Sequence, residues 1–297
     1  MSQPVQEFTI PFKGYETWVR VVGAGEQAGK LPLLCLHGGP GATHDYLESL
    51  DVMADTGRRV IYYDQLGCGR SEIPESKPEM WTVDLFVEEI DVVRIALGLE
   101  KIHLLGQSWG GMLAMEYMLT QPVGIASLTI ASSPASMIQW VEEANRLREQ
   151  LPPDVQQTLL EHEAAGTTST AAYQDAMQVF YDRHVCRVPY PDYMKRSFDY
   201  LARGGEVYNT MNGPSEFHVV GTLKQWDVRD RLPEIAAPTL VTSGRYDEAT
   251  PLIAETVTHG IPGAQSVIFE NSSHSSHVEE ADRYVQVLTD FISQHEP

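Results

Sequence analysis

The sequence GQSWG at residues 106–110 is a G-x-S-x-G motif, and the segments on its two sides differ in character. Before it, residues 101–105 form a short apolar run that predicts a buried strand, and after it residues 112–119 predict a helix. A serine on so sharp a strand-to-helix turn needs small residues beside it, and its hydroxyl projects where the helix dipole favours negative charge. In this setting the motif predicts that Ser108 is a nucleophile.

Short apolar runs and helical patterns alternate on both sides of this motif. Such alternation with short connections is typical of an α/β fold, in which helices cover both faces of a mostly parallel sheet. The expected strands are residues 8–12, 17–22, 31–36, 59–63, 101–105, 125–131, 239–243 and 266–269, and the expected helices between and after them are residues 83–97, 112–119, 251–259 and 279–294.

The alternation stops near Ser133 and resumes at residue 239. We interpret the chain as one α/β core, residues 1–133 and 226–297, that is interrupted by a helical insertion at residues 134–225. The chain has no internal repeat and no linker long enough to separate independent domains. The insertion is rich in aromatic residues and methionine, and its expected helices are residues 137–150, 153–165, 171–184 and 190–202.

The composition is that of an acidic globular protein. Hydrophobic residues make up 42% and charged residues 21% of the 297 residues, which excludes the disordered classes. The net charge of −20 repels phosphate backbones and anionic lipid, so neither nucleic acid nor a membrane surface is an expected partner. No apolar run approaches the ~18 residues of a transmembrane helix, and no signal peptide is visible. Three widely spaced cysteines, Cys35, Cys68 and Cys186, fit reduced thiols, so we expect a cytoplasmic protein.

An activated serine needs a base, and the base needs an acid to orient it. In this fold both should follow the serine at carboxyl ends of later strands, acid first. Asp247 follows the strand at 239–243, and His274 follows the strand at 266–269. Neighbouring alternatives are Glu248 for the acid and His277 for the base, and we assign His277 to a turn or the substrate pocket. The expected triad is therefore Ser108, Asp247 and His274.

The sequence HGGPG at residues 37–41 ends another expected strand. Acyl transfer develops negative charge on the carbonyl oxygen, which preorganised backbone N–H groups stabilise. We expect one donor from Trp109, directly after the nucleophile, and the other from Gly39. Pro40 has no N–H to donate and stiffens the loop. His37 is expected to shape this loop and not to transfer protons.

The remaining motif, DQLGCGRS at residues 64–71, also ends a strand. We interpret Cys68 within it as a structural thiol. The chain contains neither a nucleotide-binding glycine pattern nor a metal-binding histidine or cysteine pattern. We therefore expect no cofactor and no metal.

HGGPG, DQLGCGRS, GQSWGG, GRYD at residues 244–247 and the late histidine together resemble the proline iminopeptidase family of α/β-hydrolases. The resemblance covers nearly the whole chain and implies an eight-stranded sheet with an inserted helical cap. It looks closest to the branch that contains the tricorn-interacting aminopeptidase and bacterial L-amino-acid amidases, including prolinamide amidases. That closer match lies in NGPSEF at residues 212–217 and in YDE at residues 246–248.

The resemblance implies the triad roles given above and a subsite for the substrate's free amino or imino group. Glu216 and Glu248 would hold this group, and Tyr208 would help to line the subsite. Two carboxylates can accept both N–H groups of a prolinium ion. Common family members have arginine at the position of Leu66 and glycine at that of Ser273, and they do not generally have glutamate at that of Glu248. These departures leave strict selectivity for proline open, but they do not affect the expectation that the protein is a serine hydrolase.

The expected function is release of an N-terminal amino acid, proline favoured, from short peptides through an acyl-enzyme. Hydrolysis of amino-acid amides at the same site is the first alternative, and an esterase or lactonase, which has no use for paired glutamates, is the next. A non-catalytic binding protein is disfavoured by the complete set of site residues. Expected substrates carry a free N-terminus, and the oligomeric state is left open.

Overall fold

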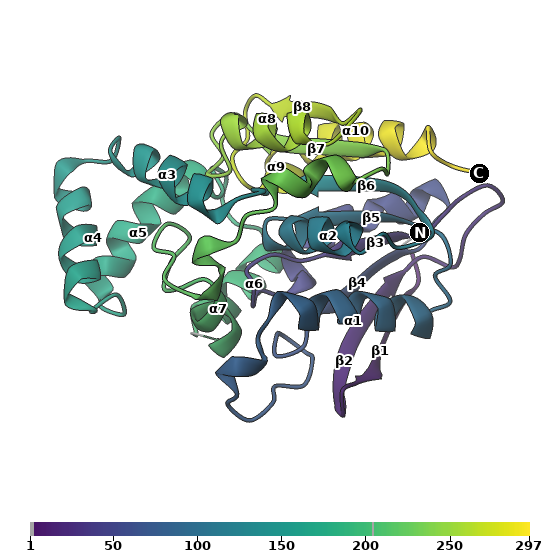
Figure 1. Cartoon of the computed structure of the whole chain (residues 1–297), viewed down its shortest axis with the longest axis horizontal. Helices are drawn as coiled ribbons and strands as arrows, with labels where there is room; N and C mark the ends of the chain where they lie inside the picture. Colours follow the sequence, from purple (N-terminus) through teal and green to yellow (C-terminus); the bar gives the residue numbers. More distant parts are fainter. Residues whose placement is uncertain (1–2, 204) are drawn as a thin grey trace.

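The computed structural model describes residues 3–203 and 205–297, and within them it contains one eight-stranded sheet (Figure 1). The strand order is β1-β2-β4-β3-β5-β6-β7-β8. Antiparallel pairing joins β1 to β2 and β2 to β4, and all other neighbours are parallel, which confirms the expected mostly parallel sheet. The strands are β1 (Val5–Phe12), β2 (Tyr15–Val22), β3 (Leu33–Leu36), β4 (Val60–Asp64), β5 (Ile102–Gln107), β6 (Ile125–Ala131), β7 (Thr239–Gly244) and β8 (Gln265–Phe269).

Four strands of the sheet are buried over their whole length because both faces of the sheet are covered. Every residue of β3, β4, β5 and β7 is buried. Alternate residues of one strand reach different cores, so Leu34 and Leu36 lie in one apolar cluster and Leu33 and Cys35 in another. The short apolar runs of the sequence are therefore strands with two buried faces.

Helices form both covering layers, as expected. Residues of α1, α2 and α8 pack in the first cluster, and residues of η1 and α10 pack in the second. Figure 1 shows α1 and α2 lying along the sheet. The bounds are α1 (Val83–Ala96), α2 (Trp109–Leu119), α8 (Pro251–Gly260), α9 (Ser276–Glu279), α10 (Ala281–Ser293) and the 3₁₀ segments η1 (His44–Thr56), η2 (Pro78–Met80), η3 (Thr222–Gln225) and η4 (Arg229–Glu234).

The chain between β6 and β7 is helical and extends beyond the end of the sheet, with α4 and α5 farthest from it (Figure 1). These helices have an apolar core of their own that includes Leu159, Tyr173, Phe180 and Phe217. None of the helices in the described ranges combines the length and apolarity needed to cross a membrane. The helices of this region are α3 (Met137–Arg148), α4 (Pro153–Ala165), α5 (Ala171–His184), α6 (Asp192–Leu201) and α7 (Glu206–Met211).

Two expected helices have other bounds in the structure, and two segments were not expected. The helix expected from residue 112 already begins at Trp109, directly after the serine. The last expected helix, 279–294, is broken at Glu280, which has φ −128° and ψ 50°. Its carboxylate accepts hydrogen bonds from the Asn271 N–H and the Ser272 hydroxyl, and so ties the break to the loop before His274. The segments η1 and α7 were not anticipated.

Candidate active site

Ser108 lies on the turn between β5 and α2 with φ 56° and ψ −125°, a conformation that residues with a side chain rarely adopt. The neighbouring glycines make this turn possible. A Cβ atom on Gly106 would lie 2.0 Å from the carbonyl oxygen of Gly110, and one on Gly110 would lie 2.1 Å from that of Leu36. The sequence motif therefore forms the strained strand-to-helix turn that presents a nucleophilic serine.

Asp247 and His274 meet although 27 positions separate them in the sequence. Asp247 follows β7 and His274 follows β8, and these strands are neighbours in the sheet. Nδ1 of His274 lies 2.7 Å from Oδ1 of Asp247, which also accepts the Ala249 N–H at 2.8 Å. The ionised carboxylate makes Nδ1 the donor, so Nε2 is left to accept a proton.

The charge around His274 favours its protonated form. Burial alone lowers the pKa of this imidazole, but the charge and hydrogen bond of Asp247 and the charges of Glu216 and Glu279 outweigh burial and raise the pKa above its ordinary value. A raised pKa makes a stronger base, which is what removal of the serine proton requires.

Ser108 and His274 line the same cavity, which holds about 450 Å³ of space between atoms, part of it open to solvent. Among the hydrogen bonds of the described residues, none joins the Ser108 hydroxyl to Nε2 of His274. Such bonds often tighten only when substrate binds. The structure therefore brings the expected nucleophile and base to one site.

The HGGPG loop lies against the serine. A Cβ atom on Gly38 would be 3.0 Å from Cβ of Ser108, and the Gly38 N–H donates to the hydroxyl of Tyr46 at 2.7 Å. Gly39 has φ 110°, which favours glycine. Neither the Gly39 N–H nor the Trp109 N–H donates to another backbone group in the described part of the chain. Both N–H groups are therefore available to a substrate oxygen, whereas that of Gly38 is not.

Glu216 and Glu248 both line the cavity of Ser108 and His274. Glu248 is 1% exposed, its two carboxylate oxygens have no hydrogen-bond partner among the described residues, and Oε1 lies 3.7 Å from Nε2 of His274. Burial and the charges of Glu216 and Asp247 raise the pKa of Glu248 well above its usual range. Burial likewise raises the pKa of Glu216, against the opposing effects of Tyr208 and His274. A buried carboxylate without donors, such as that of Glu248, calls for a cationic ligand.

Glu216 is held at three points by side chains of three helices. The hydroxyl of Tyr208, on α7, donates to Oε1 at 2.7 Å. Nε1 of Trp140, on α3, donates to the Glu216 carbonyl at 2.7 Å, and the Glu216 N–H donates to the hydroxyl of Tyr181, on α5, at 3.3 Å. Tyr208 thus contacts Glu216, whereas it is not among the residues that line the two hollows at Ser108.

A second, smaller hollow of about 260 Å³ borders Ser108 on another side. Gly39, Ser108 and Glu216 line both hollows, and Trp109 lines the smaller one. Its lining is mostly apolar and includes Met112, Pro134, Met137, Trp140 and Leu223.

Several residues of the site were not expected from the sequence. Tyr46, on η1, donates to Oε1 of Gln107, and Nε2 of Gln107 donates to the His274 carbonyl at 3.1 Å. Trp140 packs its ring edge-on to His274, with centroids 6.0 Å apart. Gln107 could have been expected from its place inside the G-x-S-x-G motif, whereas no local sequence pattern marks Tyr46 or Trp140.

His277, the alternative base, lies outside the cavity. His277 is buried on α9, its Nε2 faces the Tyr46 carbonyl at 3.2 Å, and it is not among the cavity residues. Burial lowers the pKa of His277 to about 4. Of the two expected places, a turn or the substrate pocket, the structure does not support the pocket: His277 packs between α9 and η1. Cys68 is a buried free thiol, as expected for a structural residue.

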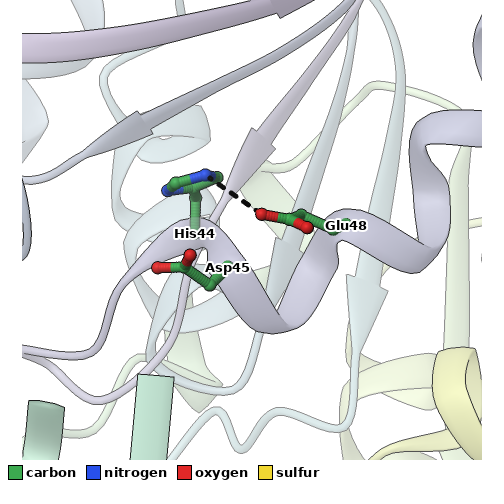
Figure 2. Close-up of side chains that lie close together, drawn as sticks. All are labelled: His44, Asp45 and Glu48. Carbon is green, nitrogen blue, oxygen red and sulfur yellow. Dashed lines mark ion pairs between the residues drawn. The ribbon is translucent and has the colours of Figure 1, made fainter. Parts of the chain in front are cut away.

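One cluster outside the cavity has potential metal ligands: the ligand atoms of His44, Asp45 and Glu48 lie within 4.8 Å of one another (Figure 2). The two carboxylates already share a cation. Arg196 of α6 donates to Asp45 at 2.8 Å and to Glu48 at 2.6 Å, and Arg70 also binds Asp45. These arginines neutralise the acidic groups, so we interpret the cluster as an ionic contact between η1 and α6.

Comparison with known proteins agrees with this geometry. The family model described as alpha/beta hydrolase fold matches residues 32–281. The chain is 41% identical to a proline iminopeptidase of Lactobacillus helveticus over 295 residues, 98% of each chain. Among solved structures it is similar to the proline iminopeptidase of Mycobacterium smegmatis, with a TM-score of 0.91, 46% identity and 98% of each chain covered. It is also similar to VinJ, with a TM-score of 0.94 and 46% identity over 98% of this chain and 99% of VinJ.

Proposed function

Because this chain belongs to the proline iminopeptidase family of α/β-hydrolases, we propose that it is a serine aminopeptidase that releases N-terminal proline from short peptides. The observation that carries the proposal is the buried, unpartnered carboxylate of Glu248 beside His274. An exopeptidase must bind a charged amino or imino group one residue from the bond it cleaves. Glu248 and Glu216 supply acceptors at that distance from the reacting groups.

The proposed reaction is two-step acyl transfer. Oγ of Ser108 attacks the carbonyl carbon of the N-terminal residue while Nε2 of His274 takes the hydroxyl proton. Asp247 holds the imidazole through Nδ1 and stabilises its charged form. The N–H groups of Gly39 and Trp109 donate to the developing oxyanion.

The C–N bond breaks as His274 gives its proton to the leaving amine. Water then enters and loses a proton to His274 as its oxygen attacks the acyl carbon. The bond between this carbon and Oγ of Ser108 breaks, and His274 returns a proton to the serine. The products are the free amino acid and the shortened peptide.

The apolar hollow beside Ser108 fits the side chain of the released residue. Its walls of Met137, Trp140 and Leu223 match a pyrrolidine ring in polarity, and Glu216, which borders the same hollow, would bind the ring nitrogen. We assign residues 134–225 the role of a cap that supplies these walls and excludes water from the acyl-enzyme. Strict selectivity for proline is not required by this lining, because other small apolar side chains match it too.

Amino-acid amides such as prolinamide present the same amino group and carbonyl, so the same residues would hydrolyse them. Plain esters would not use the two glutamates. The three cysteines are buried free thiols, which fits a reducing compartment such as the cytoplasm.

The test is a comparison of initial rates on prolyl p-nitroanilide, a Pro-Ala dipeptide, prolinamide and p-nitrophenyl acetate, with Ser108→Ala beside the wild type. The proposal expects the prolyl anilide and the dipeptide to be hydrolysed, with loss of both activities in Ser108→Ala. Turnover of prolinamide without turnover of the dipeptide would identify an amidase. Preference for the acetate ester would contradict the roles of Glu216 and Glu248.

A further inference from the structure

Gln65 links the two segments that supply the oxyanion donors. Its Nε2 donates to the carbonyl of His37 at 2.9 Å, and its backbone N–H donates to Nε2 of the same histidine at 2.9 Å. Its Oε1 accepts the indole N–H of Trp109 at 2.9 Å. One side chain thus holds the start of the HGGPG loop with one end and the residue after the nucleophile with the other.

The position of Gln65 in the sheet explains how it reaches both segments. It follows β4, the HGGPG loop follows β3, and Ser108 follows β5. The order β4-β3-β5 makes these three strands neighbours. Gln65 therefore spans the carboxyl ends of three adjacent strands, with the oxyanion site at their centre.

The hydrogen bonds of His37 connect Gln65 to the peptide group of Gly39. Since Nε2 of His37 accepts the Gln65 N–H, the ring proton is on Nδ1, which donates to the Gly38 carbonyl at 2.9 Å. Burial lowers the pKa of His37 to about 4, so the ring is neutral near pH 7. The peptide group that joins Gly38 to Gly39 is therefore held through its carbonyl, and its N–H is the Gly39 donor itself.

All members of this linkage are buried. Gln65 and His37 are 0% exposed and Trp109 is 1% exposed, so no water replaces a bond that is lost. The turn behind Gln65 is anchored as well: the Leu66 N–H donates to the carboxyl group of Glu89 at 3.0 Å, and Thr17 donates to the same group. Burial and these hydrogen bonds hold Gln65 in one position.

We propose that Gln65 is a positioning residue that sets the distance between the two oxyanion donors, the N–H groups of Gly39 and Trp109. It acts through His37 and Trp109 and touches neither the substrate nor the reacting atoms. The inference rests on the proposed function only in requiring acyl transfer at Ser108, whatever the acyl group is. A residue with this role affects the transition state, in which the oxyanion exists, and not the binding of substrate.

The experiment compares Gln65→Met, Trp109→Phe and the double variant with the wild type. Gln65→Met keeps the backbone bond to His37 and removes both side-chain bonds, and Trp109→Phe removes only the indole bond. Gln156→Met is the matched control, since Gln156 on α4 makes two amide hydrogen bonds far from both hollows. For each variant, kcat and KM are measured on prolyl p-nitroanilide and p-nitrophenyl acetate, and the fraction of active serine is counted with a fluorophosphonate.

The expected result is a fall in kcat of ~10–100-fold for Gln65→Met on both substrates, below the ~10²–10³-fold lost with a whole oxyanion donor. KM stays within about 3-fold, and the active fraction is unchanged. Trp109→Phe shows a smaller fall. The kcat of the double variant is within about 3-fold of that of Gln65→Met, because both changes break the hydrogen bond between Gln65 and Trp109.

The proposal is overturned if kcat of Gln65→Met stays within about 3-fold of the wild type. It is also overturned if only KM changes, or if kcat falls only in proportion to the fraction of active serine. If Gln65→Met does not fold, an unchanged kcat in Trp109→Phe overturns it, and a lower kcat with unchanged KM supports it. Should the wild type hydrolyse the ester but no prolyl substrate, the proposed peptidase function is wrong, and the ester data still decide the role of Gln65.

Discussion

Oε1 of Glu248 lies 3.7 Å from Nε2 of His274, the nitrogen that takes and gives the proton in the proposed reaction. Glu248 follows directly after Asp247, which binds the other nitrogen of the same ring. In the proposed reaction, one of these two consecutive carboxylates orients the base and the other binds the substrate. An ammonium group bound by Glu248 would then lie close to the bond that is cleaved, as the proposed aminopeptidase reaction requires.

Loss of the free carboxylate should weaken substrate binding. We predict that Glu248→Gln lowers kcat/KM for prolyl p-nitroanilide by ~10–100-fold, mainly through KM, because a charge-assisted hydrogen bond becomes a neutral one. Turnover of p-nitrophenyl acetate, which has no amino group, should change by less than about 3-fold. Glu161→Gln, an exposed glutamate on α4, is the matched control. Equal losses on both substrates would contradict the assigned role.

The pH profile should report the raised pKa of His274. The base must be neutral to accept the serine proton, so activity rises with pH through this pKa, above the ordinary value of about 6.5. Glu216 is one of the charges that raise it. Glu216→Gln removes a negative charge and should therefore move the acid limb of kcat/KM to lower pH. The measurement uses p-nitrophenyl acetate, so that ionisation of the substrate subsite does not contribute, and an unmoved or raised limb would refute the assignment.

Loss of the Asp247 carboxylate should lower kcat far more than it changes KM. Asp247→Asn keeps an oxygen that can accept the Ala249 N–H, but it no longer fixes the imidazole tautomer or stabilises its charge. We expect kcat to fall by ~10⁴-fold with KM nearly unchanged. A thermal melt and the count of fluorophosphonate-reactive serine check that the protein is folded. A loss below about tenfold would mean that another carboxylate orients His274.

The serine turn should tolerate no side chain at Gly106. A methyl group there would meet the Gly110 carbonyl oxygen at 2.0 Å, and the backbone would have to move. We predict that Gly106→Ala lowers the free energy of unfolding by about 3 kcal/mol or more. Gly205→Ala is the control, since a Cβ atom there meets nothing within 4 Å and its φ is −60°. Urea unfolding of both variants makes the comparison, and equal stability would show that the turn relaxes freely.

The sheet and the positions of the reactive residues could be predicted because they depend on local patterns. Short apolar runs predict buried strands, and parallel strands bring their carboxyl ends to one edge, so Ser108, Asp247 and His274 were expected to meet. The structure places all three there, at the strand ends of the sheet. The place of Glu216 and Glu248 was expected only from the resemblance of NGPSEF and YDE to the proline iminopeptidase family.

The remaining features depend on contacts that no local pattern contains. Trp140 and Tyr181 come from α3 and α5, and they join the site only because the inserted helices fold back over it, whereas Tyr46 comes from η1 in the α/β core. The segment η1 did leave a signal, since His44, Leu47, Leu50 and Met53 are buried at intervals of three residues, the period of a 3₁₀ helix. A search limited to helices of 3.6 residues per turn misses it.

The most direct test of recognition through the amino group is the ratio of kcat/KM for prolyl p-nitroanilide to that for N-acetyl-prolyl p-nitroanilide in the wild-type protein. Acetylation removes the positive charge and leaves the ring, the scissile bond and the leaving group unchanged. If Glu216 and Glu248 bind a prolinium nitrogen, the free substrate should be favoured by at least ~10³-fold, since the acetylated one would leave the buried carboxylate of Glu248 unpaired. A ratio near one would show that the two glutamates do not select the substrate.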